Sequence, residues 1–201
     1  MIEEIKKIFE KQGGEFISSP SFISERLKNI KAYIFDWDGV FNTGTKTDNS
    51  GSPFSEVDSM GTNLLRFGYW LANNHQLPLV GIITGENNQT AIHLARRENF
   101  HHIYFNFKNK ALAIEHFMAT FGLKPNEVAF LFDDILDIPI AINCGLRFMI
   151  NREGSPLFRN FVLKNSCADY ISGQTGGHFA VREISELVLG LSDQFEKALK
   201  E

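Results

Sequence analysis

The sequence has few cysteines and no long apolar stretch, and each absence excludes a class of protein. Only Cys144 and Cys167 occur among 201 residues, and their spacing matches no zinc or redox motif. A chain of this length can fold without disulfides, so we expect both thiols to be small core residues. The N-terminus mixes charged and apolar residues and lacks the continuous apolar stretch of a signal peptide or membrane span. Together these features predict a cytoplasmic protein.

The sequence also lacks any run rich in lysine and arginine, and its formal net charge is only −4. Proteins that bind nucleic acid or anionic membranes carry a basic patch, so we expect neither partner. An anionic substrate would need a local cationic site or a metal ion. The chain contains no internal repeat and no low-complexity tract. Its 43% hydrophobic composition, with 19 phenylalanines, is sufficient for one sizeable core.

Short apolar runs alternate with helical patterns from Lys31 onward. Strands are expected at 32–37, 79–84, 102–106, 128–132 and 146–150. Helices are expected between them at 60–74, 88–98, 109–121 and 135–142. This alternation predicts an α/β fold: a Rossmann-like, three-layer, doubly wound parallel sheet.

Two segments lie outside this alternation. Residues 1–30 contain two short helical patterns, near 1–12 and 22–27, and are expected to form an N-terminal helical extension to a single domain of residues 31–201. The polar stretch from Asn42 to Asp58 predicts a small β-hairpin insertion after the first strand, with its loop at Asp48 to Pro53.

Acidic residues follow two of the apolar strands. Asp36 and Asp38 follow the first and, two residues apart on an extended chain, point the same way. Asp133 and Asp134 follow the strand at 128–132, where N-capping of the next helix would account for one and partly for the other. Capping does not explain why acids recur at two strand ends. If these strands are neighbours, their acids converge with Thr84 at one edge of the sheet.

Such a cluster of acids requires a cation. Two carboxylates about 4 Å apart repel by roughly 4 kcal/mol at an effective dielectric constant near 20. All-oxygen ligands with room for water favour Mg²⁺ over Zn²⁺.

Two further features suit a phosphate group, although each has an ordinary structural explanation. Thr84-Gly85 offers a hydroxyl and an unhindered amide at a strand end, but glycine also closes many βα turns. Lys110 opens the helix at 109–121, where the helix dipole disfavours a cation. Lys108 is a rival for the same role, and either lysine could simply be a solvated surface residue.

Taken in order along the chain, these residues resemble the haloacid dehalogenase-like (HAD) phosphohydrolase superfamily. The resemblance spans about residues 31–190 and is closest to the capless subfamily typified by octulosonate-phosphate phosphatases. It rests on the following segments: Asp36-x-Asp38-Gly39-Val40, Thr84-Gly85, Lys110, Asp133-Asp134-x-x-Asp137, 54–61 with Asp58, and 176–183.

The resemblance implies a Mg²⁺-dependent, two-step phosphoryl transfer. Asp36 would be the nucleophile that becomes an aspartyl phosphate, and Asp38 would be the general acid and base. Mg²⁺ would be held by the Asp36 carboxylate, the Asp38 backbone carbonyl and Asp133. Thr84 and Lys110 would neutralise the charge on the phosphoryl oxygens.

The same resemblance implies supporting roles for other residues. Asp134 would orient Lys110 or a metal-bound water, and Asp137 is as readily structural as functional. Residues expected in or near the substrate site are Gly85, Glu86, Asp58, His178 and Arg182.

The spacing of the motifs leaves no room for a cap domain. Between Asp38 and Thr84 only the hairpin, one helix and one strand fit, and between Thr84 and Lys110 only one helix and one strand. The family's homotetramer would complete the open pocket with a neighbour's hairpin or its Gly176-Gly177 tail.

Several positions depart from the subfamily pattern, among them His178-Phe179, which replace a smaller, more basic pair. Glu86 replaces an arginine, and Ser59 and Phe132 each replace a glycine. Glu86 would repel a substrate carboxylate unless a cation such as Arg97 compensates.

The leading hypothesis is a phosphomonoesterase for a small phosphorylated sugar acid of the octulosonate- or nonulosonate-phosphate type. The alternatives are a catalytically inactive, oligomerising module of the same fold and a phosphatase for a non-sugar metabolite such as a nucleotide.

Overall fold

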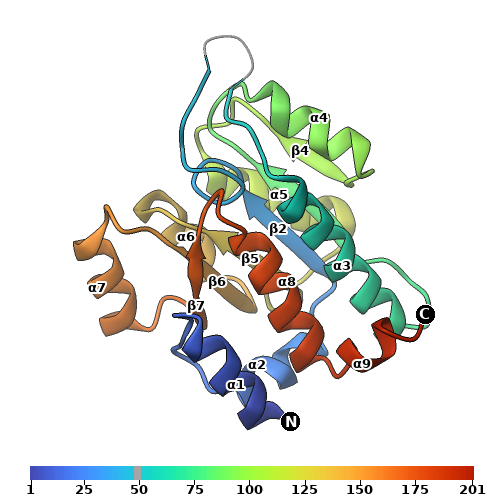
Figure 1. Cartoon of the computed structure of the whole chain (residues 1–201). Helices are drawn as coiled ribbons and strands as arrows, with labels where there is room; N and C mark the ends of the chain where they lie inside the picture. The colour runs from blue at the N-terminus through green and yellow to red at the C-terminus, as the bar shows by residue number, and fades with distance from the viewer. Residues whose placement is uncertain (48–50) are drawn as a thin grey trace.

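The computed structural model describes residues 1–47 and 51–201, and its centre is a seven-stranded sheet in the order β1-β7-β6-β5-β2-β3-β4 (Figure 1). The strands are β1 (Glu15–Phe16), β2 (Ala32–Asp36), β3 (Leu79–Ile83), β4 (His102–Tyr104), β5 (Val128–Phe132), β6 (Leu146–Asn151) and β7 (Tyr170–Thr175). β1 pairs antiparallel with β7, and the other neighbouring pairs are parallel. The expected parallel α/β sheet is therefore confirmed.

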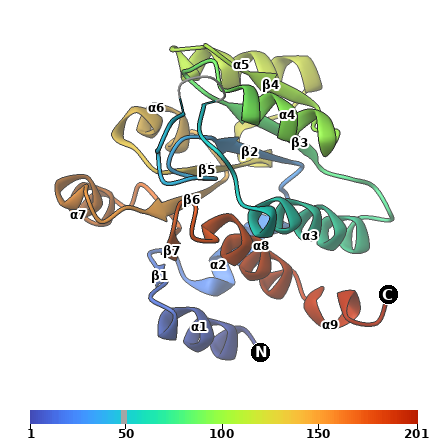
Figure 2. The same cartoon turned by 45° about the horizontal axis from the view of Figure 1, so that its top comes forward.

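Helices cover both faces of the sheet (Figure 2). One face packs against α1 (Ile2–Lys11), α2 (Pro20–Leu27), α3 (Glu56–Ala72), α4 (Gln89–Arg97) and α8 (Ala180–Leu191). The other packs against α5 (Lys110–Phe121), α6 (Ile138–Ala141) and α7 (Pro156–Asn165). The short helix α9 (Phe195–Ala198) follows α8 and contacts α3. The two 3₁₀ turns are η1 (Pro125–Glu127) and η2 (Ile135–Asp137).

The central strand shows why this sequence forms a covered strand. All residues of β2 are buried: Tyr33 and Phe35 join the core beneath α3 and α8, while Ala32 and Ile34 join the core beneath α5 and α6. A strand that is apolar on both sides is stable only between two layers of helices. The chain then leaves the sheet at Asp36, where the strand ends.

The segments between the central strands are short. Among the described residues, α3 and its flanking loops separate β2 from β3. The segments α4, β4, α5 and η1, with their connecting loops, separate β3 from β5. The structure thus contains no cap domain in the described part of the chain, as the motif spacing predicts.

Of the expected hairpin after the first strand, the described residues show a single antiparallel pairing. Between β2 and α3 the pairing consists of one antiparallel bridge, Thr47–Gly51. Residues 48–50, part of the loop expected at Asp48 to Pro53, lie outside the described residues. The helix expected at 135–142 divides into η2 and α6, because Pro139 lacks an N–H group and is tolerated only in the first turn of a helix.

The first 30 residues form the two expected helices and also take part in the main sheet and core. Glu15 in β1 pairs with Ile171 in β7. Ile23, Leu27 and Ile30 are buried in the core that lies beneath α8. The N-terminal segment therefore packs with the rest of the chain.

Neither cysteine forms a disulfide. Cys167 is buried and Cys144 is half-buried. No helix in the described ranges combines the length and the apolar character needed to cross a membrane.

Helices α3 and α8 lie side by side, and a glycine allows their close approach (Figure 2). A Cβ atom on Gly61 would lie 2.8 Å from the Cα atom of Arg182 in α8, so any larger residue would push the helices apart. We expect Gly61→Ala to lower the free energy of unfolding by about 1–3 kcal/mol through this overpacking.

Denaturant unfolding of this variant measures the loss directly. Gly154→Ala is the matched control, because a Cβ atom there meets nothing within 4 Å, and we expect it to change stability by less than about 0.5 kcal/mol. Equal stabilities of the two variants would contradict the packing assigned to α3 and α8.

Candidate active site

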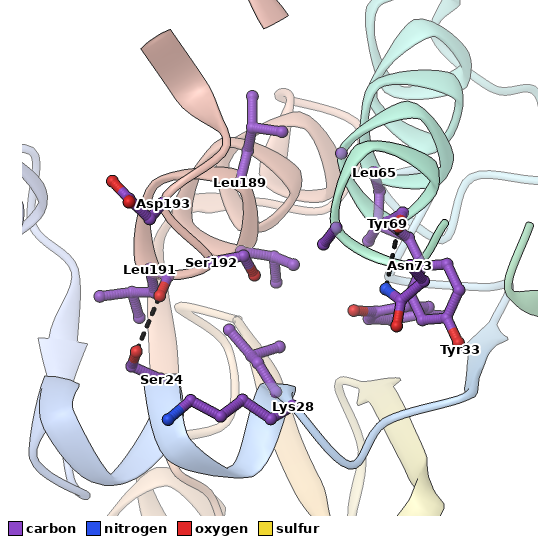
Figure 3. Close-up of a pocket in the computed structure, with 14 residues that line it drawn as sticks. Ser24, Lys28, Tyr33, Leu65, Tyr69, Asn73, Leu189, Leu191, Ser192 and Asp193 are labelled. Carbon is purple, nitrogen blue, oxygen red and sulfur yellow. Dashed lines mark hydrogen bonds between the residues drawn. The ribbon is translucent and has the colours of Figure 1, made fainter. Parts of the chain in front are cut away.

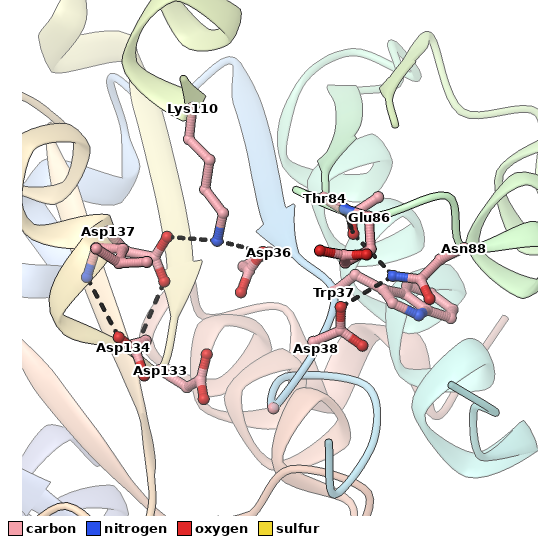
Figure 4. Close-up of polar contacts among 12 residues, drawn as sticks. Asp36, Trp37, Asp38, Thr84, Glu86, Asn88, Lys110, Asp133, Asp134 and Asp137 are labelled. Carbon is pink, nitrogen blue, oxygen red and sulfur yellow. Dashed lines mark hydrogen bonds and ion pairs between the residues drawn. The ribbon is translucent and has the colours of Figure 1, made fainter. Parts of the chain in front are cut away.

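The carboxyl ends of three neighbouring strands bring the predicted polar residues to one edge of the sheet (Figure 4). β2 lies between β5 and β3. Asp36 ends β2, Asp133 follows β5 and Thr84 follows β3. The strand order on which their convergence depends is thus confirmed.

Lys110 forms two ion pairs at the centre of this edge. Its Nζ atom lies 2.7 Å from Asp36 Oδ1 and 2.7 Å from Asp137 Oδ1. Lys110 is the first residue of α5, and the rival Lys108 is exposed on the preceding loop. The positive charge of Lys110 interacts unfavourably with the dipole of α5, and the ion pairs with two buried carboxylates offset this cost.

Asp36, Asp133 and Asp137 form a cluster that could hold a metal ion. Each offers a carboxylate oxygen, and these oxygens all lie within 4.8 Å of one another. Their residues are at most 3% exposed. Burial raises the pKa of Asp133 to about 7 and also raises the pKa of Asp36 and of Asp137. The charged form of the cluster is costly without a further cation.

The carboxylate of Asp133 has hydrogen-bonding capacity left for such a cation. Neither of its oxygens accepts a hydrogen bond from the described residues, although Arg152 Nη1 lies 2.8 Å from Oδ2 as an ion pair. The loop after β2 passes against this carboxylate, since a Cβ atom on Gly39 would lie 2.0 Å from Asp133 Oδ2. Gly39 also has φ +86°, which favours glycine. The backbone of the Asp38–Gly39 segment therefore borders the cluster.

Asp38 occupies a different environment from Asp36. Ser52 Oγ donates to its Oδ1 at 2.5 Å, and Asn88 Nδ2 donates to its Oδ2 at 2.9 Å. Lys46 Nζ lies 3.7 Å from Oδ2, and the Asp38 side chain is 27% exposed. The two carboxylates at the end of β2 thus differ in environment. Asp36 is buried and paired closely with Lys110, whereas Asp38 is partly exposed, hydrogen-bonded by two neutral side chains and more distant from its lysine.

Asp134 and Glu86 do not contact Lys110. Asp134 accepts a hydrogen bond from Arg152 at 3.1 Å and from the backbone of Leu136, so Asp137 rather than Asp134 orients the lysine. Glu86 is exposed, beside Gly85 and close to Thr84 at the mouth of the site (Figure 4).

Asp58 and Arg182 contact each other at the junction of α3 and α8. Asp58 Oδ1 accepts a hydrogen bond from the backbone N–H of Arg182 at 3.1 Å, in the first turn of α8. Burial raises the pKa of Asp58 to about 6. The Arg182 side chain pairs with Glu186. These contacts stabilise the start of α8 rather than touching the acidic cluster.

Two residues that depart from the subfamily pattern, Phe132 and Ser59, make contacts that stabilise the fold. Phe132 is fully buried and stacks on Phe130. Ser59 Oγ donates to Glu98 at 3.1 Å within a network that joins α3 to α4. Arg97 belongs to that same network through Glu98 and Glu56, and these contacts give no support for the expected neutralisation of Glu86 by Arg97.

A hollow of about 580 Å³ lies beside the cluster. Its lining includes Gly39, Arg152, Gln174, Thr175 and His178, of which His178 is exposed and bonded to Thr175. It is large enough and polar enough for a small sugar.

A second hollow of about 290 Å³ lies near the start of β2, between α2, α3 and α8 (Figure 3). Ser24 donates to the backbone of Leu191 there, and Asn73 donates to the backbone of Tyr69. These two side chains thus bind the protein's own backbone, and the hollow lies at the opposite ends of the strands from the acidic cluster.

Sequence reasoning missed four residues whose side chains contact Asp38 or Asp133: Lys46, Ser52, Asn88 and Arg152. Arg152 follows the end of β6, so the rule that drew attention to Asp36 and Asp133 could have found it. Asn88 precedes α4, where an asparagine is ordinarily a helix cap, and Ser52 lies in a loop that offers no pattern.

Comparison with known proteins assigns the family. No family model matches the chain. A solved structure from Legionella pneumophila, described as a hydrolase of HAD superfamily subfamily III A, is 31% identical, covers 89% of this chain and 92% of its own, and superposes with a TM-score of 0.72. The chain therefore belongs to the HAD superfamily of hydrolases.

Further relatives are phosphatases that act on an octulosonate phosphate. The 3-deoxy-D-manno-octulosonate 8-phosphate phosphatase KdsC of Yersinia pestis is 28% identical over 178 residues, 88% of each chain. A structure of this phosphatase from Moraxella catarrhalis, in complex with magnesium, phosphate and KDO, shares the fold with a TM-score of 0.72 at 24% identity, over 89% of this chain and 96% of its own. Within the superfamily, this chain is similar to the KdsC phosphatases.

The raised pKa of Asp133 predicts how the stability of the metal-free protein depends on pH. Because its pKa rises from 3.8 to about 7 on folding, the folded state binds more protons than the unfolded state in that window, and stability falls as pH increases through it. We expect the melting temperature to fall by at least about 3 °C from the lower to the upper end of the window.

Thermal melts in a metal chelator measure this dependence, with Asp133→Asn as the control that removes it. We expect Mg²⁺ to restore the stability of the wild type at the upper end. A wild type whose melting curve follows pH no more steeply than Asp133→Asn would contradict the buried charge assigned to Asp133.

Proposed function

We propose that this chain hydrolyses the phosphate monoester of a small sugar acid, of the octulosonate- or nonulosonate-phosphate type, through an aspartyl phosphate on Asp36 and with Mg²⁺ as cofactor. The observation that carries the proposal is the separation of Asp36 from Asp38. One carboxylate is buried against Lys110 at 2.7 Å. The other is accessible, accepts hydrogen bonds from the neutral side chains of Ser52 and Asn88, and has the Lys46 ammonium at 3.7 Å. Two acids in different environments suit two different chemical roles.

In the first step, an oxygen of Asp36 attacks phosphorus while the bond from phosphorus to the sugar oxygen breaks. Asp38 gives its proton to that departing oxygen. In the second step, Asp38 takes a proton from a water molecule, which attacks the phosphorus of the aspartyl phosphate. Inorganic phosphate leaves, and the Asp36 carboxylate is regenerated.

The charges of the site support these steps. Lys110 Nζ fixes Asp36 Oδ1, which leaves Oδ2 for the attack, and the ammonium lies where it can bind a phosphoryl oxygen. Thr84 supplies a hydroxyl at the neighbouring strand end. Asp36, Asp133 and the backbone carbonyl of Asp38 would hold Mg²⁺, which neutralises charge on the phosphoryl group when bound. The Asp133 oxygens, which accept no hydrogen bond from the described residues, fit that role.

The hollow beside the cluster supports a sugar acid as the substrate class. Arg152 offers a guanidinium to a substrate carboxylate, and His178 and Gln174 offer groups for hydroxyls. The KdsC relatives are named for such a substrate. An inactive scaffold would leave the buried carboxylate cluster without a purpose.

The open mouth supports an assembly in which a neighbouring subunit covers the site, and we propose the homotetramer. Three apolar residues near the site are each more than half exposed: Leu112, Ile135 and Leu136. They lie on α5 and η2, the elements that also carry Lys110 and Asp137. Sedimentation at micromolar concentration is expected to give a tetramer, and a monomer would contradict this arrangement.

Two substitutions with two substrates test the chemistry. We expect Asp36→Asn to lower kcat/KM by at least about 10³-fold on any phosphate ester, because the nucleophile is lost. We expect Asp38→Asn to lower kcat/KM by about 10²–10⁴-fold on 3-deoxy-D-manno-octulosonate 8-phosphate, whose alkoxide needs a proton to leave.

On p-nitrophenyl phosphate the loss in Asp38→Asn should be much smaller, since nitrophenolate leaves without a proton. The ratio kcat/KM is suitable because it includes only the steps up to the first irreversible bond cleavage. Circular dichroism establishes that the variants fold. Full activity of Asp36→Asn, or equal losses on both esters in Asp38→Asn, would refute the assigned roles.

A further inference from the structure

Asn88 follows the Thr84-Gly85 turn and precedes the first residue of α4. An asparagine at this position ordinarily accepts a hydrogen bond from the backbone N–H groups of the first helical turn. Here the Asn88 side chain makes no such bond. It is only 1% exposed and is turned toward the sheet edge instead (Figure 4). The side chain therefore serves something other than the helix.

The amide group of Asn88 joins two residues of the proposed machinery. Its Nδ2 atom donates to Asp38 Oδ2 at 2.9 Å and to Thr84 Oγ1 at 2.8 Å, so both N–H bonds are used. Thr84 Oγ1 also accepts from the backbone N–H of Glu86 at 3.4 Å. With its oxygen accepting twice, the Thr84 hydroxyl keeps its own proton to donate to a phosphoryl oxygen.

The loop after residue 50 closes around the same amide. The backbone N–H of Ser52 donates to Asn88 Oδ1 at 3.4 Å, and Thr90 Oγ1 donates to the backbone oxygen of Ser52. Gly51 permits this contact, since it has φ +80° and a Cβ atom there would lie 2.4 Å from Asn88 Oδ1. The loop thus delivers the Ser52 hydroxyl to the second oxygen of Asp38.

These contacts matter because Asp38 lies on a loop and not on the strand itself. Each of its two oxygens receives one neutral donor, one from Asn88 and one from Ser52, which fixes the plane of the carboxylate. A general acid must lie within hydrogen-bond reach of the departing oxygen, and a displacement of about 1 Å can cost about 10²-fold in rate. Thr84 anchors the amide to the rigid end of β3.

We propose that Asn88 is a positioning residue for the acid of this phosphatase: its side-chain amide fastens the carboxylate of Asp38 to Thr84 at the end of β3. The inference rests on the proposed function, because it requires that Asp38 protonate the leaving group. It goes beyond that function by adding a residue outside the motifs through which the family is recognised.

The test measures kcat/KM of the full chain with Mg²⁺ on two esters, 3-deoxy-D-manno-octulosonate 8-phosphate and p-nitrophenyl phosphate. Asn88→Ala removes both donors, and Asn88→Asp keeps the shape of the side chain while replacing the donor nitrogen with oxygen. We expect both variants to lose about 10- to 100-fold on the alkyl ester and several-fold less on the aryl ester.

Asn87→Ala is the matched control, since this exposed neighbour bonds only to Gln89 in the described structure, and we expect wild-type rates. A double-mutant cycle completes the test. In an Asp38→Asn background, Asn88→Ala should cost little further on the alkyl ester, because its effect acts through the lost acid.

The outcomes separate the two claims. If Asp38→Asn shows the difference between esters but both Asn88 variants lose equally on the two, the positioning role is wrong and the proposed function stands. The positioning role is also wrong if Asn88→Ala lowers kcat/KM on the alkyl ester as much in the Asp38→Asn background as in the wild type. If Asp38→Asn itself loses equally on both esters, the acid assignment and the inference that rests on it both fail.

Discussion

The placement of one lysine among three buried carboxylates is the constraint on which the rest of the site depends. Lys110 lies 2.7 Å from both Asp36 and Asp137, and Asp133 completes a cluster of oxygens within 4.8 Å. Arg152 adds a second positive charge 2.8 Å from Asp133, yet burial still raises the pKa of all three acids. The cluster therefore favours a divalent cation and, with it, an anionic phosphoryl group.

The scaffold separates acids that stabilise the fold from acids available for chemistry. Asp58 is as buried as Asp137, yet it accepts a hydrogen bond from the first turn of α8 and joins two helices. Phe132 and Ser59 are likewise absorbed by packing and by the α3–α4 network. Glu86 differs from both, because it is exposed at the mouth of the site and changes the charge that a substrate meets.

The sequence predicted the parallel sheet, because alternating apolar runs and helical patterns leave few other folds. It also predicted which strand ends meet, since β5, β2 and β3 are neighbours in the doubly wound order. The sequence could not predict which side chains contact each other. Asp137, and not Asp134, orients Lys110, and this choice depends on the direction of the side chains in and before η2. Asn88 was hidden because its position has an ordinary explanation as a helix cap.

A crystal structure grown with manganese tests the central claim most directly, because Mn²⁺ suits the same oxygen ligands as Mg²⁺ and its anomalous scattering locates it. We expect an anomalous peak for a manganese ion bound by the carboxylates of Asp36 and Asp133, with Lys110 still paired with Asp36 and Asp137. A cluster without an ion, in which the Arg152 guanidinium remains on Asp133 at saturating manganese, would contradict it.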